Sequence, residues 1–361
     1  MRPLRLLVPI ASASFVLLVA APAWACGGLV NSNGSVTLVR TTTMAAYHQG
    51  VEHYVTSFEF AGGEGEFGSI IPLPGVPTKV IRGGDWTLQR LVQETQPQRF
   101  GALALDAGAE AVPAAAKVIL KTEIDALDIV VLEGGGTAVG NWAREHGFFL
   151  PPDAPEVLDF YAERSPIFMT VRFDADRAAE QGLSQGDGTP VHVVIPTPNP
   201  WVPLRILGLG AAADAPVEAN VYLLTDIEPT MLPAPLAPGV ASRLPGTSHP
   251  GLILQQSTPA STSLLADLRS DKGMDWLPSD EMWLTYLRLD AEAGELDYDL
   301  AIDASGAGQP SLVAAGLEPV AEPDPVRFDG YRAALWTAIG ILVALGVASL
   351  LQRRRTGRPA V

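Results

Sequence analysis

An apolar segment near each end constrains this chain more than any other feature of its 361 residues. The first segment begins with Arg2 and Arg5, continues through an apolar stretch, and ends in Ala23-Trp24-Ala25. A basic start, an apolar centre and a small-x-small site are the pattern of a cleaved secretory signal peptide. The sequence therefore predicts a signal peptide over residues 1–25, with the cleavage site set by Ala23 and Ala25. A retained membrane helix is the weaker alternative, because the apolar stretch is short.

The second segment, Ala333 to Leu351, contains no charged residue and is followed by Arg353, Arg354 and Arg355. A helix of this length rises about 28 Å, close to the thickness of the bilayer's hydrocarbon core. Arginines that end such a segment stop transfer and stay in the cytoplasm. We expect a transmembrane helix over 333–351 and a basic cytoplasmic tail over 352–361. A buried helix of a soluble domain is the alternative.

The region between these segments is strongly acidic. Six of the 24 basic residues lie in the signal peptide and the tail, which leaves 18 against all 40 acidic residues. This balance argues against a nucleic-acid partner, because phosphate contacts dominate that kind of affinity. The sequence thus predicts a cell-membrane protein with one span, an acidic domain outside the cytoplasm and a short tail inside.

Cys26 is the only cysteine and would be the first residue of the mature chain. A single cysteine excludes an intramolecular disulfide framework and any zinc site built from several cysteines. For the state of Cys26 we favour a buried or free thiol, then an intermolecular disulfide, and last a lipid anchor. Lipidation ranks last because Ala23 stands where an aliphatic residue is usual.

The exported region 26–303 has the pattern of an α+β domain rich in β-structure. Two stretches of β-branched and aromatic residues, 35–47 and 52–60, predict an antiparallel hairpin through His48-Gln49-Gly50. Further apolar runs at 117–120 and 127–132 predict buried strands. Apolar spacing and capping residues predict a few short helices, at 85–94 with Asp85 as the cap, 140–146 and 155–164.

Two segments of this region, about 30–125 and 126–230, share an arrangement. Each has a strand, a polar excursion and an apolar strand that ends in Ile71-Pro72 or Ile195-Pro196. Proline interrupts ladder hydrogen bonds, so both dipeptides should mark strand ends. The segments form either two related β units or a chance recurrence. A later hairpin is expected within 280–303 through Ala293-Gly294, and a flexible spacer over 304–332.

The sequence contains no standard catalytic, cofactor or metal motif. Gly134-Gly135-Gly136 with Gly140 is one residue off the dinucleotide fingerprint and reads as a tight turn. The five histidines form no H-E-x-x-H or H-x-H pattern. The acidic stretch 267–299 lacks a calcium-loop pattern and reads as a solvated face. We therefore expect no catalytic residues, no cofactor and no metal ligands.

Trp201 and Arg205 give the one hint of a binding surface. Trp201 lies between Pro200 and Pro203, in what reads as a loop, where an exposed ring could bind an envelope glycan or peptide. Buried packing is the favoured alternative, since tryptophan is mostly buried on average.

Several stretches resemble a known family. They are Ala25-Cys26-Gly27-Gly28, FGSIIPLPGVP at 67–77, LVQETQP at 91–97, NWAREHGFFLPPDAPEVLDFYAERSPIF at 141–168 and VPLRI at 202–206. Together they resemble the bacterial domain-of-unknown-function family 2330. The resemblance implies an exported, often membrane-anchored protein of uncharacterised activity, and no catalytic residues. Many members carry a second cysteine soon after the first, but Leu29-Val30-Asn31 stands here, so no disulfide within the chain is implied.

These observations favour a binding or interaction module at the bacterial cell envelope, with an envelope protein or glycan as partner. The alternative is an extracytoplasmic hydrolase without a standard motif, so enzymatic activity stays open, with the balance against it. A hydrolase should bring His48 or His53 beside a carboxylate in a deep cleft. The sequence leaves the ligand and the oligomeric state undetermined.

Overall fold

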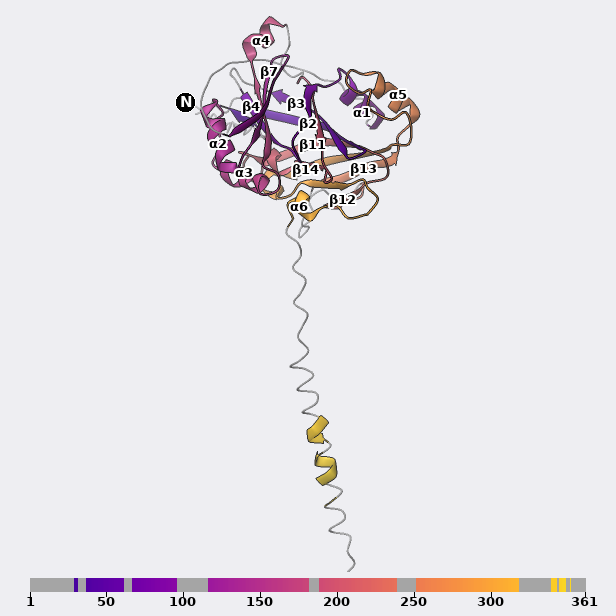
Figure 1. The fold of residues 1–361 in the computed structure, drawn as a ribbon. Helices are drawn as coiled ribbons and strands as arrows, with labels where there is room; N and C mark the ends of the chain where they lie inside the picture. The colour runs from indigo at the N-terminus through magenta and orange to yellow at the C-terminus, as the bar shows by residue number, and fades with distance from the viewer. Residues whose placement is uncertain are drawn as a thin grey trace, which may run out of the picture. The chain divides into compact units, whose positions relative to one another are not determined.

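The computed structural model describes residues 29–31, 37–61, 67–95, 116–181, 188–238, 251–317, 339–342, 344–348 and 351. The expected signal peptide, Cys26 and the arginines at 353, 354 and 355 lie outside these residues. The chain divides into two compact units, Met1–Leu317 and Glu318–Val361. The first unit is an α+β fold (Figure 1).

A seven-stranded sheet, in the order β13-β14-β11-β2-β3-β9-β5, forms the centre of the first unit. Its strands are β2 (Thr37–His48), β3 (Val51–Ala61), β5 (Lys79–Arg82), β9 (Val191–Pro196), β11 (Pro216–Thr225), β13 (Leu252–Pro259) and β14 (Trp283–Glu292). Neighbours are antiparallel except β11 and β2, which are parallel. β2 and β3 pair along their whole length, so the hairpin predicted through His48-Gln49-Gly50 is confirmed.

Two further sheets are antiparallel throughout. The five-stranded sheet, in the order β1-β4-β8-β7-β6, contains β1 (Leu29–Asn31), β4 (Phe67–Pro72), β6 (Lys117–Ile124), β7 (Leu127–Glu133) and β8 (Ile167–Phe173). The three-stranded sheet, in the order β10-β15-β12, contains β10 (Trp201–Val202), β12 (Thr230–Leu232) and β15 (Leu300–Asp303).

The helices are short, as expected. They are α1 (Thr87–Thr95), α2 (Gly136–Glu145), α3 (Ala154–Ala162), α4 (Ala175–Glu180), α5 (Thr262–Ser270), α6 (Leu312–Ala315) and the 3-10 turns η1 (Arg205–Gly208) and η2 (Ala293–Glu295). The helices predicted at 85–94, 140–146 and 155–164 correspond to α1, α2 and α3 with shifted ends. Figure 1 shows α1 close to α5, and α2 close to α3.

The seven-stranded sheet buries side chains on both faces. Ala45 and Leu223 belong to a core cluster that also contains Ile129 of the five-stranded sheet and Leu158 of α3. Their neighbours along the strands, including Ala46, belong to a second cluster with side chains of α1 and α5. Successive side chains of a strand point to opposite faces, so the central sheet lies between these two cores.

Both Ile-Pro dipeptides mark strand ends, as predicted. β4 ends at Pro72 and β9 ends at Pro196. The two segments that share this pattern are interleaved, because β3 pairs with β9 in one sheet while β4 pairs with β8 in another. The relation between 30–125 and 126–230 stays a prediction.

The hairpin predicted within 280–303 is wrong. β14 pairs with β11 and β13, whereas β15 pairs with β10 and β12 in a different sheet. The chain turns away after β14 through η2, where Glu292 and Glu295 form a reciprocal capping box. Asp299 then fixes the following segment beside β10, since its carboxylate accepts from the backbone N–H groups of Leu204 and Arg205.

The predicted spacer begins too early. Residues 304–317 belong to the first unit, and Ala314 and Ala315 of α6 are buried. Arg164 donates to the Ala314 carbonyl, and the Asp299 N–H donates to the Ala315 carbonyl. Alanine-rich composition suggested a flexible linker, but these small side chains allow the chain to pack closely.

In the second unit, the described residues within 339–351 are helical, and all of their side chains whose burial is described are exposed. The large apolar side chains among them are Ile339, Ile341, Leu342, Leu345, Val347 and Leu351. Across the described part of the chain, no helix combines the length and apolarity that crossing a bilayer requires. The transmembrane helix expected at 333–351 is therefore not shown by the structure.

Candidate functional site

Trp201 is a core residue, as the favoured interpretation predicted, and the less favoured alternative, a place on an exposed binding surface, is excluded. It is 3% exposed and its ring stacks on that of Tyr161 with centroids 5.7 Å apart. The prolines beside it suggested a loop, yet Trp201 lies in β10, paired with Ala301. The guanidinium of Arg205 packs 4.2 Å from the Phe160 ring centroid and pairs with Glu156. Burial of Trp201 is the alternative that average tryptophan behaviour favoured.

A fully buried carboxylate, Asp299, organises this region. Its Oδ1 accepts from the Tyr161 hydroxyl at 2.8 Å and from the Leu204 and Arg205 backbones at 2.6 and 3.0 Å. Its Oδ2 accepts from the guanidinium of Arg164 at 2.6 Å. Burial raises the pKa of Asp299. The guanidinium of Arg164 and the backbone N–H groups of Leu204 and Arg205 act in the opposite direction. All of these hydrogen bonds join groups of the folded chain, so the network stabilises the fold and is not a ligand site.

Glu52 is a second buried acid and has a different environment. Both of its carboxyl oxygens are buried without a hydrogen-bond partner among the described residues. Burial raises its pKa to about 8; the backbone N–H of Trp201 lies near enough to lower the pKa slightly but does not meet hydrogen-bond geometry, so it offsets only part of the effect of burial. Glu52 is therefore a neutral carboxylic acid at pH 7. It points to the same face of β3 as Tyr54.

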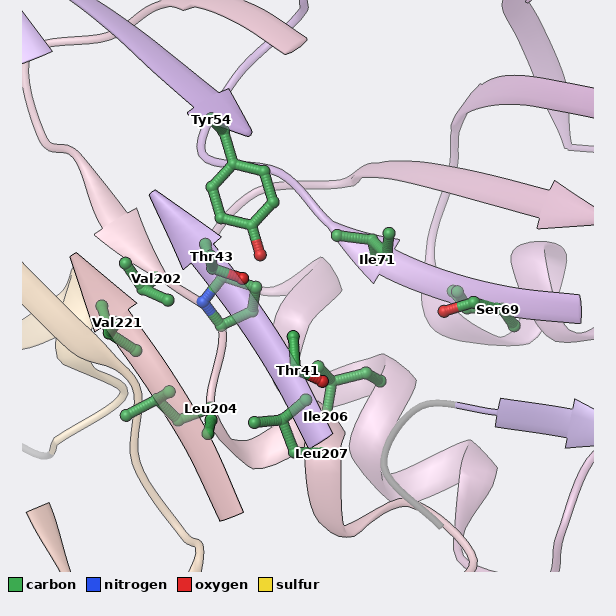
Figure 2. A pocket seen from close by; sticks show the side chains of 13 residues that line it. Thr41, Thr43, Tyr54, Ser69, Ile71, Val202, Leu204, Ile206, Leu207 and Val221 are labelled. Carbon is green, nitrogen blue, oxygen red and sulfur yellow. The ribbon is translucent and has the colours of Figure 1, made fainter. Parts of the chain in front are cut away.

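A small enclosed cavity lies in the core beside Tyr54. Figure 2 shows the Tyr54 and Thr43 hydroxyls at one part of its wall and Thr41 and Ser69 at others. Its volume is about 20 Å³, and it is otherwise lined by apolar side chains. The hydroxyls of Thr41 and Ser69 are buried without a partner among the described residues. A cavity of this size accommodates a single water molecule and no larger ligand.

A histidine pair lies on the opposite face of the central sheet. Nδ1 of His53, on β3, is 3.0 Å from Nε2 of His192, on β9. The His53 ring stacks on Trp276 with centroids 3.5 Å apart. Burial is the main cause that lowers the pKa of His53 to about 3 and that of His192 to about 4. Both imidazoles are therefore neutral at pH 7.

An open groove of about 500 Å³ lies next to this pair, between β5 and the end of β6. Its lining residues are Val80, Ile81, Arg82, Thr122, Glu123, Ile124, Asp125, Lys272 and Gly273. A Cβ added to Gly273 would lie 3.8 Å from Nδ1 of His192, so the glycine separates the histidine pair from the groove. The volume is within the usual range for ligand pockets.

Charge is arranged unevenly along the groove. Arg82 donates to Asp125 at 2.7 Å and also pairs with Asp85, so its charge is already matched. Asp125 holds a positive φ of 51° at the tip of the β6–β7 hairpin, a strained conformation for a residue other than glycine. Lys272 is exposed and forms no ion pair within the described ranges. The groove thus offers one unmatched cation.

The other histidines in the described part of the chain, His48 and His146, do not form the arrangement expected of a hydrolase. Nδ1 of His48 is 2.6 Å from Oδ1 of Asp226, but both side chains are partly exposed and line neither described cavity. His146 stacks on Trp142. No group of three or more His, Cys, Asp or Glu residues suited to a metal ion occurs in the described part of the chain.

The glycine cluster has a packing role. A Cβ on Gly136, at the start of α2, would lie 2.5 Å from the backbone nitrogen of Asp159 in α3. Glycine is therefore required at Gly136 because the two helices meet there; none of Gly134, Gly135 and Gly136 has a positive φ, so the reason is close packing and not the backbone conformation of a tight turn.

Sequence reasoning missed Glu52, His192 and the groove residues. Arg82, Asp125 and Lys272 are far apart in the chain, and the fold brings them together from two different sheets and the loop after α5. A charged residue inside a strand of alternating apolar positions, as Glu52 is in EHYVTSFEF, was the one available signal.

Comparisons with known proteins give a family but no activity. Among solved structures, the chain is similar to baculovirus P35 (TM-score 0.36, 9% identity, 74% of this chain and 97% of that one). It is also similar to a mutated baculovirus P35 after caspase cleavage (TM-score 0.33, 9% identity, 73% and 99%). The caspase-8/P35 complex gives a TM-score of 0.32 at 6% identity, with 73% and 90% covered. Similarities this weak support no inference about the fold or the function of this chain.

The comparison with curated proteins finds no match. Residues 20–230 match the model of a family described as uncharacterized protein conserved in bacteria. Because that match covers more than half of the chain, this protein belongs to the bacterial family DUF2330.

Proposed function

We propose that this protein is a binding module of the bacterial cell envelope and that the groove between β5 and β6 is its binding site. The observation that carries the proposal is the open groove of about 500 Å³, which is lined by the unmatched Lys272 together with apolar residues and the edge strand β5. β5 is the last strand of the central sheet in the described residues, and it pairs with β9 alone.

A short extended peptide fits these features. The unpaired edge of β5 can accept a peptide strand through main-chain hydrogen bonds, which is a common recognition mode. Ile81 is 38% exposed and offers an apolar contact, while Lys272 can pair with a carboxylate. We therefore propose a peptide ligand that carries an acidic side chain or a free carboxyl terminus.

We also propose export through the signal peptide at 1–25 and anchoring by the segment 333–351. The support is the sequence pattern, together with the exposure of the apolar side chains from Ile339 to Leu351, which a lipid environment would cover. The acidic domain would then stand outside the cytoplasm with the basic tail inside.

A peptide library displayed on phage tests the binding site. The full chain in detergent micelles would be used to select peptides, whose affinity is then measured by fluorescence anisotropy. Thr122→Trp fills the groove, and Val118→Trp places the same side chain at an exposed site outside the groove on the same strand. We expect acidic peptides to be enriched and their Kd to rise at least tenfold with Thr122→Trp and to stay unchanged with Val118→Trp.

Failure to enrich any peptide, or equal binding by both variants, would contradict this function. Mass spectrometry of the selected peptides after incubation adds a second readout. Cleaved peptides would support the hydrolase alternative instead of a binding module.

A further inference from the structure

The loop that follows α5 connects three features of the first unit. Asp271 accepts hydrogen bonds from the backbone N–H groups of Asp85 and Trp86 and from the Thr87 hydroxyl, at 3.1, 3.0 and 2.7 Å. It thereby caps the start of α1. The next residues, Lys272 and Gly273, line the groove, and Trp276 covers His53. A movement of this loop would affect all three features together.

We infer that the His53–His192 pair is an acid-sensitive latch on the loop Asp271–Trp276, and that its release at acidic pH reshapes the groove. The claim about the latch stands on the geometry of the pair. The claim about the groove rests on the proposed function.

The protons of the pair explain why acid should release it. Nδ1 of His192 is buried and has no hydrogen-bond partner among the described residues. A buried unpaired N–H costs about 1–3 kcal/mol, so the favoured arrangement leaves that nitrogen as a lone pair. In that arrangement Nε2–H of His192 donates to Nδ1 of His53.

A further proton has no satisfactory place in the closed loop. On Nδ1 of His192 it creates a buried N–H without an acceptor, beneath Gly273. On Nδ1 of His53 it faces the N–H of His192 across 3.0 Å and breaks the hydrogen bond. Opening the loop admits water to both rings and removes these costs.

Most of the surrounding charges also disfavour protonation of the two histidines. Lys79 of β5 disfavours protonation of both histidines, and His48 of the β2–β3 hairpin disfavours that of His53. Asp275 in the loop itself favours protonation of His192, but burial outweighs it. The pKa values of about 3 and about 4 apply to the closed loop, whereas in an open loop both histidines return towards 6.5.

This difference couples loop opening to pH. Below about pH 6, each exposed histidine raises the opening equilibrium up to tenfold for every pH unit, because only the open form binds the proton readily. Two histidines together give up to a hundredfold per unit. Burial raises the pKa of Asp271, but its hydrogen bonds more than offset burial and lower the pKa below its ordinary value, so the carboxylate that caps α1 stays ionised while the histidines titrate.

Hydrogen exchange of the full chain between pH 6.5 and 4.5, corrected for intrinsic rates, tests the latch. The reporting amides are Met274 and Leu277, which donate to Asp271 and Met274, and those of Asp85 and Trp86. We expect their opening constants to rise at least tenfold over this range while amides of β11 do not change. His146→Phe, which removes the histidine stacked on Trp142, should behave as the wild type.

The double variant His53→Phe/His192→Leu should make opening of the loop independent of pH. If this variant does not fold, nitrogen-15 spectra of the wild-type imidazoles replace it: His192 should carry its proton on Nε2 at pH 7, and both rings should protonate as the loop opens. Unchanged opening constants in the wild type, or imidazoles that protonate while the loop stays closed, would overturn the latch.

The affinity of a selected peptide at pH 7 and 4.5 separates the two claims. A Kd that rises as the loop opens supports the link to the groove. A loop that opens while the Kd stays constant removes that link but keeps the latch. A loop that opens when no peptide was ever selected rejects the proposed function alone.

Discussion

The Tyr161 hydroxyl donates a 2.8 Å hydrogen bond to Oδ1 of Asp299, a residue 138 positions later in the chain. The same hydroxyl accepts from the Ile206 N–H at 2.8 Å, so α3, η1 and the segment before β15 meet at one point. Tyr161 and Ile206 lie within residues 20–230, which match the family model, whereas Asp299 lies beyond them. The folded unit therefore needs the chain up to Leu317 to complete its buried polar contacts.

Replacement of Asp299 should destabilise the protein strongly. Asp299→Ala leaves the guanidinium of Arg164, whose side chain is 8% exposed, without its buried partner. Loss of one member of a buried ion pair costs about 3–5 kcal/mol. We expect the free energy of unfolding, measured by urea denaturation, to fall by about this amount.

Glu156→Ala is the matched control for Asp299→Ala. Glu156 is also paired with an arginine, Arg205, but its side chain is 77% exposed. An exposed pair contributes at most about 1 kcal/mol. Equal losses in the two variants would show that the Asp299 network does not hold these segments together.

Glu52 should make the protein less stable at alkaline pH. Its pKa is about 8 in the folded state and near 4.5 in the unfolded state, so the folded state retains a proton that the unfolded state has lost. Its contribution to stability is fully present below pH 4.5 and declines as the pH rises towards 8. The total decline is on the order of 5 kcal/mol, at about 1.4 kcal/mol per pH unit.

Glu52→Gln keeps the shape of the protonated acid and cannot ionise. We expect it to unfold with nearly wild-type free energy at pH 5 and to be more stable than the wild type at pH 8.5, by up to the decline given above. Glu163→Gln, at an exposed position, should show no such difference. A Glu52→Gln variant that is no better at pH 8.5 would mean that Glu52 ionises in the fold at little cost.

Local sequence signals predicted local structure well. The β2–β3 hairpin follows from β-branched residues on either side of Gly50, whose φ of 82° suits a tight turn. The ends of β4 and β9 follow from proline, which cannot donate to a ladder. Each of these signals acts within a few residues, so no knowledge of distant partners was needed.

The failures concern side chains whose partners are distant. Asp271 and Asp299 belong to an acidic stretch that reads as a solvated face, yet each is buried. Asp271 binds Thr87 across 184 positions, and it takes the capping role predicted for Asp85. A carboxylate is buried only where donors are already placed, and the donors of both residues come from other elements. For the same reason, the sequence did not predict the groove or the His53–His192 pair.

Gly84 should tolerate no side chain because of Asp271. A Cβ at Gly84 would lie 2.1 Å from Oδ2 of Asp271 and 2.7 Å from Oγ1 of Thr87. Gly84→Ala must therefore displace the carboxylate that caps α1, which we expect to cost about 1–2 kcal/mol in the free energy of unfolding. In the Asp271→Ala background the same substitution should cost much less, because the obstructing carboxylate is gone.

Gly140→Ala is the control for this clash. Gly140 lies within α2, and the nearest atoms to an added Cβ are 3.5 Å away. Alanine favours a helix interior over glycine by about 0.5–1 kcal/mol, so this variant should be neutral or stabilising. Similar losses for Gly84→Ala and Gly140→Ala would contradict a specific clash with Asp271.

The cavity beside Tyr54 should hold one ordered water molecule that serves Thr41 and Ser69. Its volume of about 20 Å³ admits a single water, and both hydroxyls border it without another partner among the described residues (Figure 2). Thr41→Val or Ser69→Ala alone would remove one partner of that water and leave the other hydroxyl dependent on it. We expect each to cost about 1–2 kcal/mol in unfolding free energy.

The double variant Thr41→Val/Ser69→Ala should cost less than the two losses together, since the cavity then has no polar group left to satisfy. Strictly additive losses in urea denaturation, or a high-resolution crystal structure without density between the two hydroxyls, would rule out the shared water.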